Sequence, residues 1–210
     1  MKIIRADSSD TDIFSEYELG FGACCFFTEG KTHKYFFEIK GREATLFSNT
    51  KQYIPQAIEE FLFYSGFVVT IKDENGNILL TRTKPEPFLL EIEKIQPSQF
   101  YINQKKLESC KKWIKCPEDV YIPIVTGNGK AISLDGHTRM RAAMDLGYAC
   151  VYVYPDEHDE YIFYFADEAI KRRINSVSDM ELVSDEDYKI KWHKFCDDFF
   201  EERGAQWTTT

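Results

Sequence analysis

The stretch that most constrains the fold of this chain covers residues 131–147, which read Ala-Ile-Ser-Leu-Asp-Gly-His-Thr-Arg-Met-Arg-Ala-Ala-Met-Asp-Leu-Gly. Its apolar start predicts a short buried strand. Gly136 then permits backbone angles that a side chain resists. Apolar residues at helical spacing follow, and Gly147 is typical of the residue that ends a helix. The stretch therefore predicts a strand, a tight turn and a helix, in that order.

A helix that begins directly after a glycine turn has backbone N–H groups without helical partners, and together with the helix dipole these groups attract an anion. The polar residues crowded at this start are Asp135, His137, Thr138, Arg139 and Arg141. Arginine can donate two hydrogen bonds to one phosphate, and histidine can transfer a proton near neutral pH. The pattern favours an anion site with Asp135 and His137 as candidate catalytic groups. In the alternative interpretation Asp135 only caps the helix, and His137 and Arg139 are solvated.

The same region resembles the ParB/sulfiredoxin superfamily. The resemblance covers residues 89–155, about a third of the chain, and includes the Ile-Gln-Pro-Ser-Gln segment at 95–99. The ParB box, Gly-Glu-Arg-Arg-x-Arg-Ala, is matched here at Gly136, Arg139, Arg141 and Ala142. The free-serine kinase box of the same superfamily, Asp-Gly-His-His-Arg, is matched at Asp135, Gly136, His137 and Arg139. Sulfiredoxins have a cysteine where this chain has Gly136, so a sulfinic-acid reductase is disfavoured.

The resemblance implies an α+β fold with a mixed α/β core and a nucleotide whose phosphates lie on the helix start. That nucleotide is CTP in ParB proteins, and ATP or ADP in the kinases and sulfiredoxins, with Mg²⁺ as the accompanying metal. The residues that the resemblance assigns to nucleotide binding are Gln99, Gly136, His137, Thr138, Arg139 and Arg141. Asp135 would bind Mg²⁺ or act as base, and His137 would polarise the transferring group. The kinases place a glutamate base near the position of Gln99, and a glutamine cannot accept that proton, which disfavours the kinase mechanism.

Three classes of function stay open. The first is nucleotide hydrolysis or phosphoryl transfer to a small-molecule or protein acceptor, and the second is a ligand- or partner-binding module without turnover. The third, a DNA-binding partition protein or a nuclease, is disfavoured by a net charge of −9 and a pI near 5.0. The acidic segment 156–210 also has no basic helix resembling the DNA reader of ParB proteins.

The sequence predicts four parts. Residues 1–83 form a small α+β module whose role the sequence does not indicate, and residues 84–88 form a Pro-containing linker. Residues 89–155 form the core, and residues 156–210 form an acidic helical extension that packs on it. In the module we expect strands at 23–27, 34–39, 44–47, 67–71 and 78–81, and a hairpin turn at Asn75-Gly76. We also expect a helix that begins at residues 48–50 and is closed by Gly66. Surplus aromatic residues in the module suggest a homodimer interface.

The composition also predicts a compartment. No apolar run approaches the roughly 20 residues of a membrane helix, and the first residues do not resemble a signal peptide. The six cysteines form no C-x-x-C pair, which favours reduced thiols over a metal site. We therefore expect a cytoplasmic protein that does not bind membranes.

Overall fold

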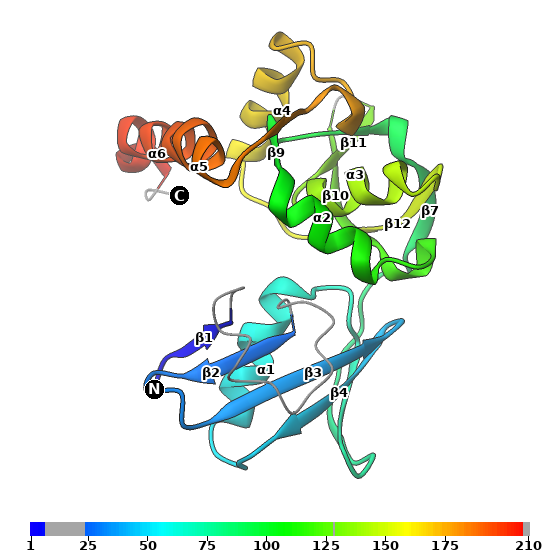
Figure 1. The fold of residues 1–210 in the computed structure, drawn as a ribbon, viewed down its shortest axis with the longest axis vertical. Coiled ribbons are helices and arrows are strands. Elements are labelled where there is room, and N and C mark those ends of the chain that lie inside the picture. The colour runs from blue at the N-terminus through cyan, green and yellow to red at the C-terminus, as the bar shows by residue number, and fades with distance from the viewer. Residues whose placement is uncertain (7–23, 128, 208–210) are drawn as a thin grey trace. The chain divides into compact units, whose positions relative to one another are not determined.

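A computed structural model describes the backbone of residues 1–6, 24–127 and 129–207, with side chains placed up to residue 203. The chain divides into two compact units, Met1–Pro87 and Phe88–Thr210, and the division falls inside the segment predicted as a linker. Each unit combines helices with β-sheet, which confirms the α+β class (Figure 1). None of the helices in the described residues is long and apolar enough to cross a membrane.

The first unit is a six-stranded sheet covered by helix α1 (Ile54–Tyr64) (Figure 1). Neighbouring strands are antiparallel except β4 and β5, which run parallel because α1 connects them. The strands, in sheet order, are β1 (Ile3–Arg5), β2 (Cys25–Thr28), β3 (Lys34–Lys40), β4 (Glu43–Ser48), β5 (Thr70–Asp73) and β6 (Ile78–Thr81). The predicted strand 23–27 corresponds to β2, although residue 23 lies outside the described residues.

Aromatic rings form the core of this unit. Phe61 of α1 stacks on Phe37 of β3 with ring centroids 4.0 Å apart, and Phe26 of β2 meets Phe37 edge-on at 5.8 Å. The strand predicted at 67–71 begins only at Thr70. The prediction was wrong at its start because Val68 N–H donates to the Ser65 carbonyl at 3.0 Å, so this buried apolar segment is a turn.

The segment predicted as a linker is tied to the first unit by one arginine. The Arg42 guanidinium donates to the carbonyls of Lys84 and Pro85 at 3.2 Å each, and it pairs with the Glu86 carboxylate at 2.6 Å. The next strand begins at Phe88. Residues 84–86 are therefore bound to the first unit by hydrogen bonds and an ion pair, and they do not form a freely extended spacer.

The second unit is built on a five-stranded mixed sheet. Its strands, in sheet order, are β7 (Phe88–Glu91), β12 (Cys150–Pro155), β10 (Tyr121–Gly127), β11 (Lys130–Ser133) and β8 (Ile95–Gln96). The helices and 3-10 turns are η2 (Ile92–Lys94), α2 (Gln104–Trp113), η3 (Pro117–Asp119), α3 (His137–Asp145), α4 (Tyr161–Lys171) and η4 (Val177–Asp179). A separate pair of parallel strands joins β9 (Tyr101–Asn103) to β13 (Glu181–Val183), and the sequence pattern did not predict this pair.

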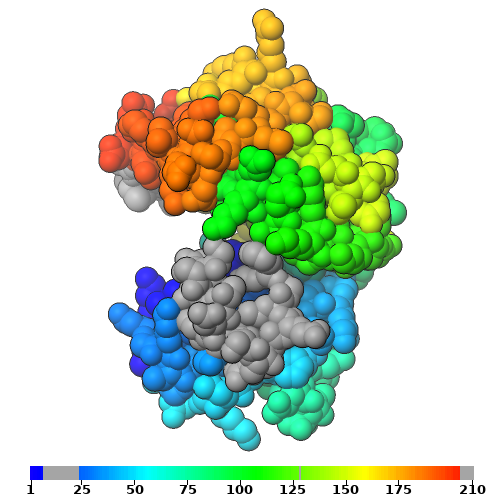
Figure 2. All heavy atoms as spheres, viewed as in Figure 1, coloured from blue at the N-terminus to red at the C-terminus, as the bar shows by residue number. Residues whose placement is uncertain are grey.

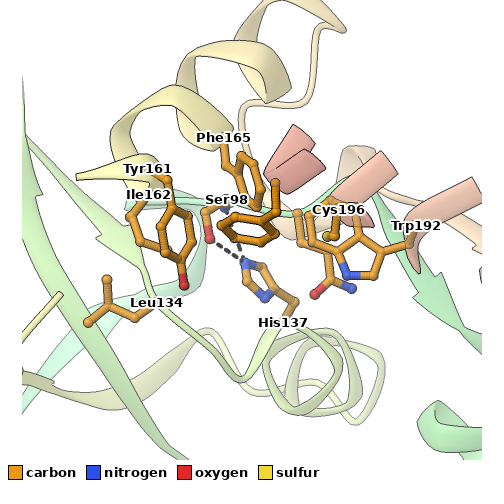
Figure 3. Close-up of a pocket in the computed structure, with 10 residues that line it drawn as sticks. Ser98, Leu134, His137, Tyr161, Ile162, Phe165, Trp192 and Cys196 are labelled. Atoms are coloured by element: carbon orange, nitrogen blue, oxygen red, sulfur yellow. Dashed lines mark hydrogen bonds between the residues drawn. The ribbon is translucent and has the colours of Figure 1, made fainter. Parts of the chain in front are cut away.

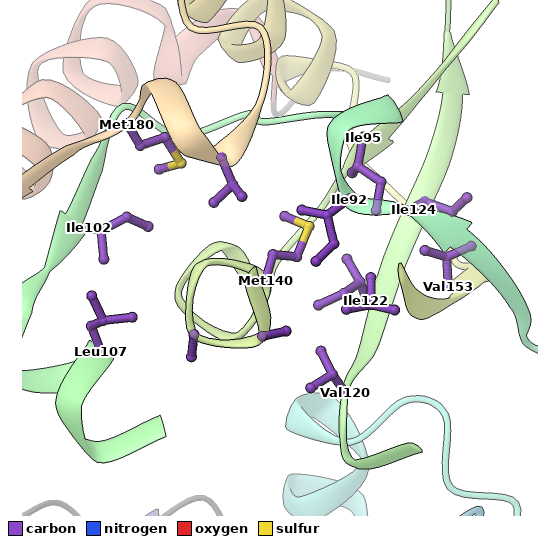
Figure 4. Close-up of a cluster of buried hydrophobic side chains, with 14 of the residues drawn as sticks. Ile92, Ile95, Ile102, Leu107, Val120, Ile122, Ile124, Met140, Val153 and Met180 are labelled. Carbon is purple, nitrogen blue, oxygen red and sulfur yellow. The ribbon is translucent and has the colours of Figure 1, made fainter. Parts of the chain in front are cut away.

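Helix α3 packs its apolar stripe onto this sheet. Met140 and Ala143 are fully buried, and Met140 lies among Ile92 and Ile122 in the central cluster (Figure 4). The helix ends where the sequence predicts, because Gly147 takes a left-handed φ of 90° and donates its N–H to the Met144 carbonyl at 2.9 Å. This packing fixes the position of the start of α3 relative to the strands.

The end of the acidic helical extension consists of three consecutive pieces: α5 (Asp185–Tyr188), a π-helical turn η5 (Lys189–His193), and α6 (Lys194–Trp207). The Ser184 hydroxyl caps α5 by accepting the Asp187 N–H at 3.0 Å. Asn103 at the start of α2 donates to the Asp185 carboxylate at 2.8 Å. The segment therefore lies against α2 and β9, where their surfaces meet in Figure 2.

Candidate functional site

The turn between β11 and α3 requires a glycine. Gly136 has φ 85°, a left-handed conformation that other residues adopt only at a cost. A Cβ at this position would lie 2.6 Å from Ile122 Cδ1, a side chain that is itself fully buried. Both the backbone angle and the lack of space therefore explain the glycine that the sequence places here.

The start of α3 is open. Gly136 is the N-cap, no side chain among the described residues caps the helix, and the first amide bonded along the helix is Met140 N–H, which donates to the Gly136 carbonyl at 2.9 Å. The alternative prediction, in which Asp135 caps this helix, was therefore wrong. The amides of His137, Thr138 and Arg139 keep the donor capacity that an anion site needs. The Thr138 side chain is half-buried at the second position of the helix.

Arg139 folds back over this turn. Its guanidinium approaches Gly136, where a Cβ would meet Nη2 at 3.1 Å, and it pairs with the Asp135 carboxylate at 3.2 Å. The Arg139 side chain is 20% exposed and that of Asp135 is 75% exposed. Within the described residues the Arg139 guanidinium bonds only Asp135, which uses one of its five N–H donors. No other group of the described residues accepts a hydrogen bond from the remaining donors.

His137 is enclosed. The residue is 4% exposed, and its Nε2 accepts the Ser98 N–H at 3.1 Å and lies 3.0 Å from Ser133 Oγ. Burial, with a smaller contribution from the Arg139 charge, lowers the pKa of His137 to about 4 against an opposing effect of Asp135. The imidazole is therefore neutral at pH 7, with its proton on Nδ1 because Nε2 is an acceptor.

Ser98 is a functional-site residue that sequence reasoning missed. It is 3% exposed, and its Oγ donates to the Ser133 carbonyl at 2.6 Å and lies 3.4 Å from His137 Nε2 (Figure 3). The sequence showed only a Pro-Ser-Gln loop there, and nothing in it indicated a contact with a residue 39 positions away. The three residues form a buried polar cluster that joins the β8–β9 loop, the end of β11 and the start of α3.

Gln99 and Arg141 both make contacts within the protein. Gln99 Nε2 donates to the Tyr101 carbonyl at 2.6 Å and to the Tyr188 hydroxyl at 2.8 Å, so it links the loop to α5. Arg141 donates to Asp145 at 2.9 Å and to the carbonyls of Val177 and Met180 at 3.5 and 3.4 Å. The Arg141 guanidinium therefore fastens α3 to the segment around η4, and the phosphate-binding role expected of it stays a prediction.

A cavity of about 190 Å³ lies beside the start of α3 (Figure 3). Of the predicted site residues, only Gln99 and His137 line it, while Asp135, Gly136, Thr138, Arg139 and Arg141 do not. The full lining is Ser98, Gln99, Leu134, His137, Tyr161, Ile162, Phe165, Trp192, Cys196 and Phe200. The residues from α4, η5 and α6 were missed as site residues because their helical spacing reads equally well as a core-facing stripe.

The described residues hold no group of three or more His, Cys, Asp or Glu side chains placed to bind a metal. Asp135 offers one exposed carboxylate at the helix start, already paired with Arg139. One carboxylate does not make a resident metal site, although Mg²⁺ often binds through one carboxylate together with the phosphates of its nucleotide.

Comparisons with known proteins leave the family open. No family model matches the chain, and no curated protein matches it. Among solved structures the chain is similar to the crystal structure of protein Atu1540 from Agrobacterium tumefaciens, with 18% sequence identity and a TM-score of 0.34. The match covers 46% of this chain and 62% of that one. A similarity this weak supports no conclusion about fold or function.

Proposed function

We propose that the Phe88–Thr210 unit binds a nucleotide-class ligand, with a phosphate on the start of α3, and that it acts by binding rather than by phosphoryl transfer. The observation that carries the proposal is the open N-terminus of α3 beside Arg139. The backbone amides of an uncapped helix start and the guanidinium of an arginine both donate hydrogen bonds that phosphate oxygens accept. The resemblance to nucleotide-binding ParB-like proteins rests on the same residues and agrees with this chemistry.

The turn supplies the geometry for such a ligand. Gly136 is the N-cap, and its left-handed φ of 85° leads the chain directly into the amides of His137, Thr138 and Arg139. Arg139 lies within reach of the same point, and its Asp135 partner is mostly exposed. A surface pair of this kind contributes little stability, so a phosphate can replace the carboxylate at small cost.

Binding without turnover fits the lack of a group at the site that transfers protons near neutral pH. A general acid or base works best with a pKa near the operating pH. His137 is neutral, its Nε2 is occupied by Ser98 and Ser133, and its pKa of about 4 makes it a weak base. Gln99, at the position of the kinase base, does not titrate. Mg²⁺ would arrive with the phosphates, with Asp135 as its one carboxylate ligand.

The proposal is tested by calorimetric titration of the protein with ATP, ADP, CTP and GTP, each with Mg²⁺. Hydrogen bonds from a charged donor contribute about 1.5–3 kcal/mol, so Arg139→Ala should weaken the tightest nucleotide about 10- to 100-fold. Lys105→Ala is the matched control, because it removes one positive charge from an exposed site on α2. It should leave the affinity unchanged.

Two results would contradict the proposal. Equal affinity of wild type and Arg139→Ala would remove the start of α3 as the phosphate site. Steady release of inorganic phosphate that is lost in His137→Gln, with nucleotide affinity unchanged, would show turnover and refute the binding-only role.

A further inference from the structure

The cavity beside α3 has the volume of a single ring. At about 190 Å³ it is smaller than the roughly 300–1,000 Å³ of typical small-molecule pockets. An apolar cavity of about 150 Å³ holds benzene, and this corresponds to about 25 Å³ of cavity volume for each of its six carbon atoms. On that scale the present cavity accommodates about seven or eight non-hydrogen atoms.

Aromatic side chains make up much of the cavity lining. Trp192, Cys196 and Phe200 follow one another at four-residue spacing along η5 and α6, so they lie on one helix face. Phe165 of α4 meets Trp192 edge-on at 5.7 Å, and Tyr161 meets Phe200 edge-on at 5.2 Å. These contacts hold the rings in edge-to-face pairs and present ring faces and edges to an occupant. Trp192 lies in a π-helical turn, a feature frequent at functional sites.

Polar groups also line the cavity. Ser98 and His137 lie there with Gln99, whose amide nitrogen is already bonded twice. Within the described residues no donor reaches the Gln99 carbonyl oxygen, so this oxygen can accept a hydrogen bond from an occupant. A few fixed polar groups in an apolar cavity typically orient a ligand.

The cavity carries no charge. His137 is neutral because of its burial, and burial raises the pKa of Cys196 to about 11, so its thiol is protonated at pH 7. The other lining residues are uncharged. A charged group inside would lose its hydration without a counter-ion, so the occupant must be neutral where it is enclosed.

We propose that this cavity binds one uncharged six-membered ring of the ligand, while the anionic part lies outside on the start of α3. His137 is the first residue of α3 and also lines the cavity, so ring and anion are adjacent. The position of the anion rests on the proposed function, but the ring site does not. Among phosphorylated ligands the size favours those with a single ring, since the volume of the partly open cavity is smaller than that of two fused rings.

The test uses four simple probes and calorimetric titration: inorganic phosphate, phenyl phosphate, 1-naphthyl phosphate and phenol. Burial of one aromatic ring should make phenyl phosphate bind at least tenfold tighter than inorganic phosphate. Naphthyl phosphate should bind no tighter than phenyl phosphate, because its second ring does not fit. Phenol should bind saturably without the anion.

Two variants locate the ring. Cys196→Leu adds volume inside the cavity and should abolish the tenfold advantage of phenyl phosphate while leaving inorganic phosphate unchanged. Phe200→Ala, at a side that is 41% exposed, removes a wall and should let naphthyl phosphate bind at least as tightly as phenyl phosphate. The second variant enlarges the site, so it tests the same inference if the first does not fold.

The outcomes separate the two proposals. Equal affinity of phosphate and phenyl phosphate in wild type overturns the ring site but leaves the anion site in place. Saturable phenol binding that is lost in Cys196→Leu, with no binding of inorganic phosphate, supports the ring site and refutes the proposed function. Tighter binding of naphthyl than phenyl phosphate to wild type overturns the single-ring inference.

Discussion

The buried histidine at the start of α3 makes the stability of the second unit depend on pH. His137 has a pKa of about 4 when folded, and its ordinary value is 6.5. Between these values the unfolded chain binds a proton that the folded chain does not. Stability from this group is therefore complete above pH 6.5 and is lost as the pH falls towards 4.

The size of the effect follows from the difference in pKa. Linkage at these two values predicts a loss of about 2 kcal/mol in the free energy of unfolding between pH 7 and pH 5 from His137 alone. Other groups titrate in the same range, so wild type must be compared with His137→Gln. The glutamine carries an amide oxygen that can accept the Ser98 N–H without titrating.

Urea unfolding followed by tryptophan fluorescence measures the right unit, because all three tryptophans of the chain lie in Phe88–Thr210. The wild-type free energy should fall by about 2 kcal/mol more than that of His137→Gln between pH 7 and pH 5. His158→Gln changes an exposed histidine and should follow the wild-type curve. Parallel curves for wild type and His137→Gln would refute the assignment of a buried neutral imidazole.

Three other predictions concern the same unit. Gly136→Ala and Gly147→Ala both place a side chain at positive φ, which costs about 1–2 kcal/mol, but only the former meets a neighbour, Ile122 Cδ1 at 2.6 Å. Gly136→Ala should cost about 1 kcal/mol more in urea unfolding, and equal costs would contradict the close contact. Arg141→Met should destabilise the unit by about 1–2 kcal/mol in the same assay while leaving nucleotide affinity unchanged, and a loss of affinity would return Arg141 to the phosphate site. Burial raises the pKa of Cys196 from 9.0 to about 11, so its alkylation at pH 7.5, followed by mass spectrometry, should be about 100-fold slower in the folded than in the urea-unfolded chain, and equal rates would contradict the burial.

Local patterns predicted the elements around the site well. The strand, the glycine turn and the helix of residues 131–147 appear as β11, Gly136 and α3, because each depends on interactions between near neighbours. The spacing of the two arginines also bears on whether both can bind the same anion. Residues two positions apart on a helix point about 200° apart, so Arg139 and Arg141 cannot both reach one anion from the same helix face. In the structure Arg141 donates to the carbonyls of Val177 and Met180, while Arg139 pairs with Asp135.

The environment of the site depends on contacts that are distant in sequence. The low pKa of His137 arises from burial by segments that include Ser98, and part of the cavity lining comes from Trp192 and Cys196, about fifty residues beyond α3. The π-helical turn that contains Trp192 has no signature in the sequence pattern. Residue types therefore predicted a candidate anion site, but neither its neutral histidine nor its adjoining cavity.

The central claim is that a phosphate binds at the open start of α3. The most direct measurement is a ¹H–¹⁵N correlation spectrum of the labelled full chain, titrated with inorganic phosphate and with the nucleotide that binds tightest. The account predicts that the amide signals of His137, Thr138 and Arg139 shift together and saturate with one dissociation constant for each ligand. Saturating shifts confined to other residues, or no shift at these three amides at saturating nucleotide, would contradict it.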